Sequence, residues 1–267
     1  ITPSPLSPDG DNGWYVTSPV LATVSSTEGT AMLFYSLAGD SGPWSVYLTP
    51  VSLSSEGDTT IWAYAADSLG NASAVTSLDV SIDTVDPTTT SDAPAGWRTS
   101  AFDITLTRFD ATSGVFQSYY AWDGGAVSTY TAPIAALEGE HTLSFWSVDL
   151  AGNVESASFV DTALDTSAPD VVIDTPADGL VTSQTVTPAA HSTDPSATLS
   201  ATLDGDPFTL GSTVATEGVW TLEVTATDPA GNTATKSVTF TIDTTPADVD
   251  ITPSPLSPDG DNGWYVT

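Results

Sequence analysis

The sequence predicts an all-β chain built from three tandem β-sandwiches, and three observations carry that prediction. One 16-residue pattern occurs three times, at residues 56–71, 138–153 and 217–232. Turn-forming residues are frequent, with 20 Gly and 19 Pro in 267 residues, and no long stretch has the spacing of an amphipathic helix. Residues 1–17 also recur without change as residues 251–267, which gives the chain a period of 250 residues.

The repeated pattern is E-G-x-x-T-[IL]-x-x-x-[AS]-x-D-x-x-G-N. Glu-Gly predicts a turn, and the alternation that follows it predicts a strand with one buried face. The side chains expected on that face are Ile61, Ala63 and Ala65, then Leu143, Phe145 and Ser147, then Leu222, Val224 and Ala226. An Asp then opens a hairpin turn that Gly-Asn closes, because Asp accepts backbone N–H groups while Gly and Asn tolerate positive φ.

A second shared stretch, Asp-Thr, ends each copy and predicts where each sandwich stops. The predicted ranges are 1–83, 84–165 and 166–243, and residues 244–267 are expected to begin a fourth sandwich. Each range offers about seven short strands with frequent turns, the profile of an immunoglobulin-like β-sandwich. The expected architecture is therefore an extended array of three tandem immunoglobulin-like β-sandwiches, plus the first strands of a fourth.

The unchanged restart at residue 251 favours a segment of a longer array with a 250-residue period. The alternative is that the trailing strand completes a sandwich in another copy of the chain by β-strand addition.

The middle range also carries a set of short motifs. They are A-P-A-G-W at 93–97, D-A-T-S-G at 110–114, Y-Y-A-W-D-G-G at 119–125, Y-T-A-P-I at 130–134 and G-E-H-T-L-S-F-W-S-V-D-L-A-G-N-V-E at 139–155. Together they resemble the bacterial immunoglobulin-like repeats of large secreted and cell-surface proteins. The resemblance covers nearly the whole chain, although the first range departs in its hairpin and the third lacks the Trp and the Tyr-x-x-Pro element. It implies an extracellular, cell-surface location and no shared catalytic site, so no enzyme activity is expected.

Composition excludes several classes of partner. The chain has no Cys, so disulfides and thiolate metal sites are excluded. It has 34 acidic and 3 basic residues, for a net charge of −31, which rules out binding nucleic acid through phosphate neutralisation. No apolar run approaches the ~18 residues that a membrane span needs, so no membrane insertion is expected in this segment. Cations and neutral molecules are the partners that suit so acidic a surface.

Calcium is the predicted cofactor, because hard cations bind clusters of carboxylate and carbonyl oxygens. The loop Asp9-Gly-Asp11-Asn12 and its copy at Asp259 and Asp261 place oxygen ligands at alternate positions. The other candidate ligands lie in the linkers between predicted sandwiches: Asp83, Asp86, Asp165, Asp170, Asp243, Asp248 and Asp250. The alternative is a set of Asp-rich turns on an acidic surface with no bound ion.

Three aromatic residues are candidates for glycan binding. Trp62 and Tyr64 alternate with Ile61 and so face away from it, and Trp146 occupies the position of Tyr64 in the second copy. The alternative is that these rings pack against other parts of the protein.

The predicted function is that of a structural spacer in an extracellular fibre, stalk or adhesin, with calcium as a stiffener of its joints. Its partners would be further copies of the repeat in the same chain or filament, with glycan or another surface protein as further candidates. Two alternatives remain open. One is a carbohydrate- or protein-binding module on a secreted enzyme, and the other is a subunit that polymerises by strand addition.

Overall fold

The computed structural model describes residues 1–252 and 260–264, and their regular structure is almost entirely β-strand. The single exception in these ranges is a 3₁₀ turn, η1 (Asp261–Gly263). No helix in the described part of the chain could span a membrane. The predicted all-β fold is confirmed, as is the absence of any long amphipathic helix from these ranges.

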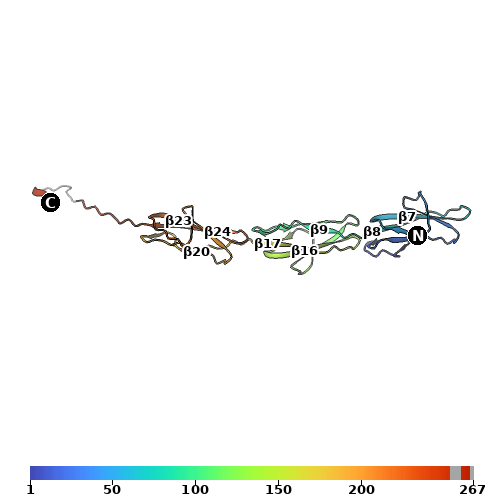
Figure 1. The fold of residues 1–267 in the computed structure, drawn as a ribbon, viewed down its shortest axis with the longest axis horizontal. Helices are drawn as coiled ribbons and strands as arrows, with labels where there is room; N and C mark the ends of the chain where they lie inside the picture. The colour runs from blue at the N-terminus through green and yellow to red at the C-terminus, as the bar shows by residue number, and fades with distance from the viewer. Residues whose placement is uncertain (253–259, 265–267) are drawn as a thin grey trace. The chain divides into compact units, whose positions relative to one another are not determined.

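The first sandwich consists of a five-stranded sheet packed on a three-stranded sheet. The five strands, in spatial order, are β2 (Trp14–Tyr15), β8 (Thr76–Ile82), β7 (Gly57–Ala66), β4 (Met32–Ser36) and β5 (Ser45–Val46). The three are β1 (Thr2–Ser4), β3 (Val20–Thr23) and β6 (Val51–Leu53). β7 and β8 lie side by side (Figure 1). Buried side chains from both sheets, among them Val20, Ile61 and Ile82, form one core.

The second sandwich repeats this plan with its second layer divided into two strand pairs. Its five-stranded sheet has the order β10 (Trp97–Arg98), β17 (Ser158–Leu164), β16 (Gly139–Asp149), β13 (Val115–Trp122) and β14 (Ser128–Thr129). The pairs are β9 (Thr88–Ser91) with β12 (Leu106–Phe109), and β11 (Asp103–Ile104) with β15 (Ile134–Ala135). Ile104, Leu143 and Phe145 lie at the centre of its core.

The third sandwich has the same five-stranded sheet. The order is β19 (Leu180–Thr182), β24 (Thr233–Ile242), β23 (Gly218–Thr227), β21 (Thr198–Leu203) and β22 (Asp206–Phe208). The remaining pair is β18 (Val172–Thr175) with β20 (Ala189–His191). Leu222, Val224 and Phe240 are fully buried in its core.

The three core clusters are separate, and each lies inside one of the predicted sandwich ranges. By backbone proximity the chain divides into two compact units, residues 1–166 and 167–267, so the first two sandwiches form one unit. Between Ile242 and residue 252 there is no strand, and residues 260–264 contain only η1. The predicted opening strands of a fourth sandwich therefore fall partly outside the described residues.

The predicted core face is confirmed. Ile61, Leu143 and Leu222 share one column of the repeated pattern, and all three are 0% exposed. The residues two positions later, Ala63, Phe145 and Val224, are also buried. The period-two alternation therefore identified which side of the long central strand faces the core.

One end of each sandwich is closed in the same way. A short strand runs parallel to the last strand, as β2 does to β8, β10 to β17 and β19 to β24. The Asp of each Asp-Thr pair continues this pairing, and the N–H of Asp83 donates to the carbonyl of Tyr15 at 2.9 Å. The Glu of each Glu-Gly pair then accepts hydrogen bonds from the Thr after that Asp, as Glu56 does from Thr84. These bonds explain why Glu-Gly and Asp-Thr recur together.

Candidate functional site

The Asp-x-x-Gly-Asn turn has the same two hydrogen bonds from Asn to Asp in all three copies. In the second copy, Asp149 Oδ1 accepts the N–H groups of Gly152 and Asn153 at 2.7 and 2.8 Å, and Oδ2 accepts the Asn153 side-chain amide at 2.8 Å. The first copy repeats the two bonds from Asn71 to Asp67, and the third repeats those from Asn232 to Asp228. In the first copy, the Asn71 amide is the main cause that lowers the pKa of Asp67 below its ordinary value.

The turn of the second sandwich differs from that of the first because a loop of the first sandwich contacts it. The N–H of Asp11 donates to the carbonyl of Ala151 at 2.7 Å, and the Asn12 side-chain amide donates to the carbonyl of Leu150 at 2.7 Å. Ala151 is fully buried as a result. The loop at residues 9–13 is thus a joint element, whose shape requires Asn12 and Gly13 at φ of 52° and 89°.

The linker between the two sandwiches makes the other half of the joint. Asp83 lies at the end of β8 and is 0% exposed. Its Oδ2 accepts the N–H of Ser113 at 3.0 Å, and its carbonyl accepts the side-chain amide of Asn153 at 2.9 Å. The same Asn153 therefore closes the turn of the second sandwich and holds the last residue of the first.

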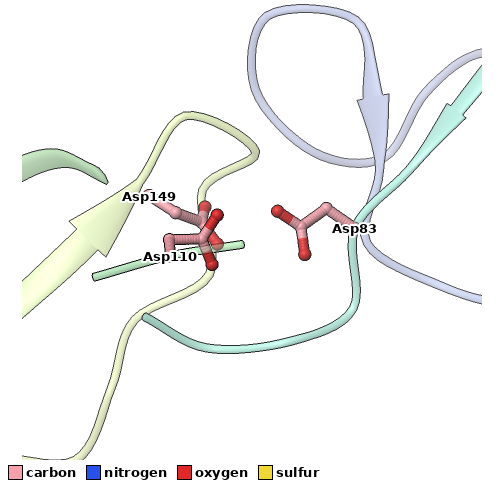
Figure 2. Close-up of side chains that lie close together, drawn as sticks. All are labelled: Asp83, Asp110 and Asp149. Atoms are coloured by element: carbon pink, nitrogen blue, oxygen red, sulfur yellow. The ribbon is translucent and has the colours of Figure 1, made fainter. Parts of the chain in front are cut away.

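Three carboxylates meet at this joint. Asp83, Asp110 and Asp149 each offer an oxygen within 4.8 Å of the others. Figure 2 shows Asp83 reaching from the linker toward Asp110 and Asp149, which both come from the second sandwich. Asp83 and Asp149 are buried, and Asp110 is half-buried. Among the described residues, no Lys or Arg pairs with any of the three.

The donor set fits a hard cation. Oxygens that share one Ca²⁺ at 2.3–2.6 Å lie at most about 5 Å apart, and carboxylates are its preferred ligands. Without a cation, two ionised carboxylates at the 4.8 Å limit of this cluster would repel by about 3.5 kcal/mol at an effective dielectric constant of ~20, and by more at shorter distances. A bound divalent cation would replace that repulsion with attraction, and it would do so across the joint.

Of the predicted calcium ligands that lie in the described ranges, Asp83 alone belongs to this cluster. Asp9 instead closes its own loop by accepting hydrogen bonds from the N–H of Val16 and the hydroxyl of Thr17. The Thr17 hydroxyl is also the main cause that lowers the pKa of Asp9 below its ordinary value. Asp11 and Asn12 serve the joint as described above.

The other candidate ligands lie apart from the cluster. Asp86, Asp248, Asp250 and Asp261 are exposed, and Asp165 is half-buried. Asp170 accepts hydrogen bonds from Ser192 and Thr193, and Asp243 accepts one from the N–H of Thr245. Asp259 lies outside the described residues. None of these positions excludes ion binding, so these ligands stay predictions.

Sequence reasoning missed Asp110 and Asp149 as members of the carboxylate cluster. Asp149 was recognised only as a turn residue, since its column holds Asp in every copy. Asp110 lies in the D-A-T-S-G motif, where its Oδ1 accepts the N–H groups of Thr112 and Gly114. Both turns lie where the second sandwich meets the linker, but this is visible only in the folded structure, because Asp83, Asp110 and Asp149 are far apart in the sequence.

The predicted glycan-binding aromatics lie on the outer face, as their alternation with Ile61 requires. Tyr64 stacks on Phe34 with ring centroids 4.9 Å apart, and it makes a T-shaped contact with Trp44 with centroids 4.7 Å apart. Trp146 stacks on Tyr119 at 5.8 Å. These ring contacts occupy faces on which a sugar would stack. Tyr64 and Trp146 are the two candidates with these ring contacts, and the glycan site stays a prediction.

Substitution of Gly10 is expected to open the joint. A Cβ on Gly10 would lie 2.5 Å from the Ala151 carbonyl oxygen and 2.6 Å from Val16 Cγ1, closer than atoms can approach. We expect Gly10→Ala to speed hydrogen exchange at the N–H of Asp11 by at least about tenfold, because this group donates across the joint. Gly29→Ala is the matched control, since a Cβ there meets nothing within 4 Å. Equal protection of the Asp11 N–H from hydrogen exchange in both variants would contradict the proposed role of Gly10 in this contact between the sandwiches.

A second predicted effect concerns His141 in the second sandwich. Its Nδ1 lies 2.7 Å from Asp123 Oδ2 and its Nε2 lies 2.8 Å from the Glu138 carbonyl oxygen. Both partners only accept hydrogen bonds, so both nitrogens must carry protons. The Asp123 carboxylate, followed by the Glu138 carbonyl, raises the pKa of His141 above its ordinary value of 6.5.

The sign of the pH dependence follows from that raised pKa. The contribution of protonated His141 to the free energy of unfolding is fully present below pH 6.5. It is lost as the pH rises through the folded-state pKa of His141. We expect urea unfolding of the second sandwich to show this loss in the natural chain and not in His141→Gln. An NMR titration of His141 with a midpoint at or below 6.5 would refute it.

The third sandwich matches a known protein family. Residues 167–244 match the family described as the bacterial Ig-like domain, so the predicted resemblance is confirmed and holds for the third sandwich by direct match. No curated protein matches the chain.

Three solved structures illustrate the range of similar folds. A tetra-tandem repeat from the extending region of a large adhesion protein is 19% identical, with a TM-score of 0.38, over 86% of this chain and 71% of that one. A structure from a 1.5-MDa bacterial ice-binding adhesin is 15% identical, with a TM-score of 0.32, over 84% and 91%. The fibronectin(III)-like modules of Clostridium thermocellum CbhA are 18% identical, with a TM-score of 0.26, over 55% and 85%.

Proposed function

We propose that the chain is a structural spacer in an extracellular fibre, stalk or adhesin, and that calcium stiffens the joint between its first two sandwiches. The observation that carries this proposal is the joint itself. A loop of the first sandwich docks onto a turn of the second, and the linker carboxylate of Asp83 faces two carboxylates of the second sandwich. A spacer needs such joints because its length depends on how little they bend.

The composition and fold support the same role. A net charge of −31 keeps the surface soluble and resists collapse onto neighbouring segments. Immunoglobulin-like repeats are typical of non-enzymatic structural and adhesion proteins, and the direct family match is to a bacterial domain of this kind. A secreted, cell-surface location is part of the same proposal, and the match to a bacterial Ig-like domain supports it.

The proposed calcium role is confined to Asp83, Asp110 and Asp149. When bound, the ion would supply charge neutralisation at the joint. The chain's own part is to hold the three carboxylates: Glu56 fixes the residue after Asp83, and Asn153 fixes Asp149. The side chain of Asp110 is held by the N–H of Gly114 at 2.6 Å.

Small-angle scattering of the chain in millimolar calcium and in chelator tests the proposal. With about 40 Å for each sandwich, estimated from a strand rise of ~3.3 Å per residue, we expect a maximum dimension of at least ~120 Å in calcium. Chelator should broaden the distribution of distances. A compact profile in both conditions would contradict the spacer, and an extended profile that is unchanged by chelator would contradict the calcium role alone.

A further inference from the structure

The outer face of the second sandwich carries a groove beside its edge strand β10. The groove has a volume of about 430 Å³ and is lined by Trp97, Glu140, Thr142, Asp161 and Ala163, among others. These five residues come from the neighbouring strands β10, β16 and β17. None of the five belongs to the carboxylate cluster at the joint, so the groove is a separate site.

Strand register places an indole and a carboxylate on either side of a small residue. Trp97 lies opposite Ala163 in β17, and Ala163 lies opposite Glu140 in β16. Leu143 and Leu164 point into the core, so alternation turns Glu140 and Ala163 outward. Two interstrand spacings of ~4.8 Å separate the backbones of Trp97 and Glu140 by about 10 Å. The hollow above Ala163 is therefore open to solvent between two larger side chains.

The groove carries unbalanced negative charge. Asp123, at its rim, pairs with His141 at 2.7 Å, so these two groups offset one another when His141 is protonated. Asp161 accepts a hydrogen bond from the neutral hydroxyl of Thr142 at 2.8 Å, which leaves its charge in place. In the described part of the chain, no Lys or Arg pairs with Asp161 or with Glu140. A cation from outside the chain would complement both carboxylates.

The exposed indole narrows the kind of cation. Trp97 is 37% exposed although it lies in a strand, so part of its ring is open to a ligand. Trp is the aromatic side chain that attracts a cation over its ring most strongly. A guanidinium group also stacks flat on an aromatic ring, and its fork of N–H groups matches carboxylate oxygens. With only 3 basic residues in the chain, a basic partner is the better source of this group.

The first sandwich has the same residue types in the same register but fills the hollow. Trp14, Ser81 and Asp58 occupy the three corresponding positions. The Ser81 hydroxyl donates to Asp58 at 2.6 Å, so this carboxylate already has a partner. Ala163 has no hydroxyl, and the carboxylate of Glu140 is left for a ligand.

The third sandwich lacks the chemistry altogether. Its three corresponding residues are Val181, Thr241 and Val219, which include no carboxylate and no aromatic ring. The open, acidic, Trp-walled form of the groove therefore belongs to the second sandwich among the three.

We propose that this groove binds an arginine side chain of a basic partner protein. The guanidinium group lies above Ala163, against the ring of Trp97, and donates hydrogen bonds to Glu140 and Asp161. The site is independent of the calcium joint, so the second sandwich adds a docking point for a cationic segment to its role as a spacer.

An NMR titration of the full chain with tetra-arginine tests the site, read at the indole N–H of Trp97. The same peptide built from citrulline is the matched control, because citrulline has the shape of arginine without its charge. We expect tetra-arginine to shift the Trp97 resonance saturably and to bind at least about fivefold more tightly than the citrulline peptide. Equal binding of the two peptides, or no shift with tetra-arginine, overturns the proposal.

Paired substitutions separate the groove from the general acidity of the chain. Glu140→Gln should weaken binding of tetra-arginine about fivefold. Asp58→Asn removes the same charge at the corresponding position of the first sandwich, outside the groove, and should change the affinity by less than about twofold. Equal losses in the two variants would show unspecific attraction to an acidic surface and would overturn the site.

A third variant closes the groove without a change of charge. Ala163→Ser places a hydroxyl beside Glu140, as Ser81 lies beside Asp58 in the first sandwich. Its binding of tetra-arginine should fall, and its melting temperature should stay that of the natural chain. Unchanged affinity in this variant would overturn the role of the hollow above Ala163.

A neutral sugar is the competing occupant, since it too stacks on an indole. Cellobiose, an uncharged disaccharide, is therefore titrated under the same conditions. We expect it to leave the Trp97 resonance in place. A saturable shift with cellobiose and none with tetra-arginine would assign the groove to glycan and overturn the arginine site.

Discussion

Asp149→Asn is expected to weaken the calcium response of the first two sandwiches. Saturating calcium at about 100 times its Kd should stabilise the natural chain by ~2.7 kcal/mol, which corresponds to roughly 5–10 °C in the melting temperature of a unit of this size. The variant should bind calcium at least about tenfold more weakly, because it removes one of three carboxylates and the charge that it carries. Titration calorimetry and thermal melts with and without chelator measure both effects.

Asp67→Asn is the matched control for this variant. Asp67 accepts the same pair of hydrogen bonds from Asn71 that Asp149 accepts from Asn153, but it is not part of the carboxylate cluster. Both substitutions disturb a turn, and only one removes a proposed ligand. Equal calcium responses in the two variants would show that Asp149 is not a ligand.

Replacement of the equivalent core residues by Ala should unfold one sandwich at a time. Ile61, Leu143 and Leu222 are each 0% exposed and belong to three separate core clusters. Each Ala variant leaves a cavity and should cost about 2–5 kcal/mol, concentrated in its own cluster. Hydrogen exchange read by mass spectrometry resolves which segments lose protection.

The outward neighbour on the same strand provides the control for the third sandwich. Glu223 is exposed beside Leu222, so Glu223→Ala should change stability by no more than about 0.5 kcal/mol. Loss of protection spread evenly over all three clusters in Leu222→Ala would contradict the independence of the cores.

The long strands of the fold were predictable because they depend on local sequence. The pattern from Glu56 to Asn71 contains its own turns and its own alternation, so strand, core face and hairpin all follow from neighbours in the chain. The short parallel strand at Trp14–Tyr15 was harder to foresee, because two residues carry no periodicity. Its place is set by pairing with β8, more than 60 residues later in the sequence.

The candidate site was predicted only in part for the same reason. Asp83 stood out because it lies in an acidic linker, but Asp110 and Asp149 belong to turns that looked complete in themselves. Their approach to Asp83 depends on how the second sandwich meets the first. The docking of the loop at Asp9–Gly13 onto Ala151 was likewise not predicted, and the ion site that its spacing suggests stays a prediction.

Distances between spin labels on the first two sandwiches measure directly whether calcium stiffens the joint between them. The natural chain has no Cys, so Ser45→Cys and Ser128→Cys place one label on an exposed edge strand of each of the first two sandwiches. We predict a narrow distance distribution in calcium that broadens in chelator, and a broad one in both conditions for Asp149→Asn. Distributions of equal width with and without calcium in the natural chain would contradict a calcium-stiffened joint.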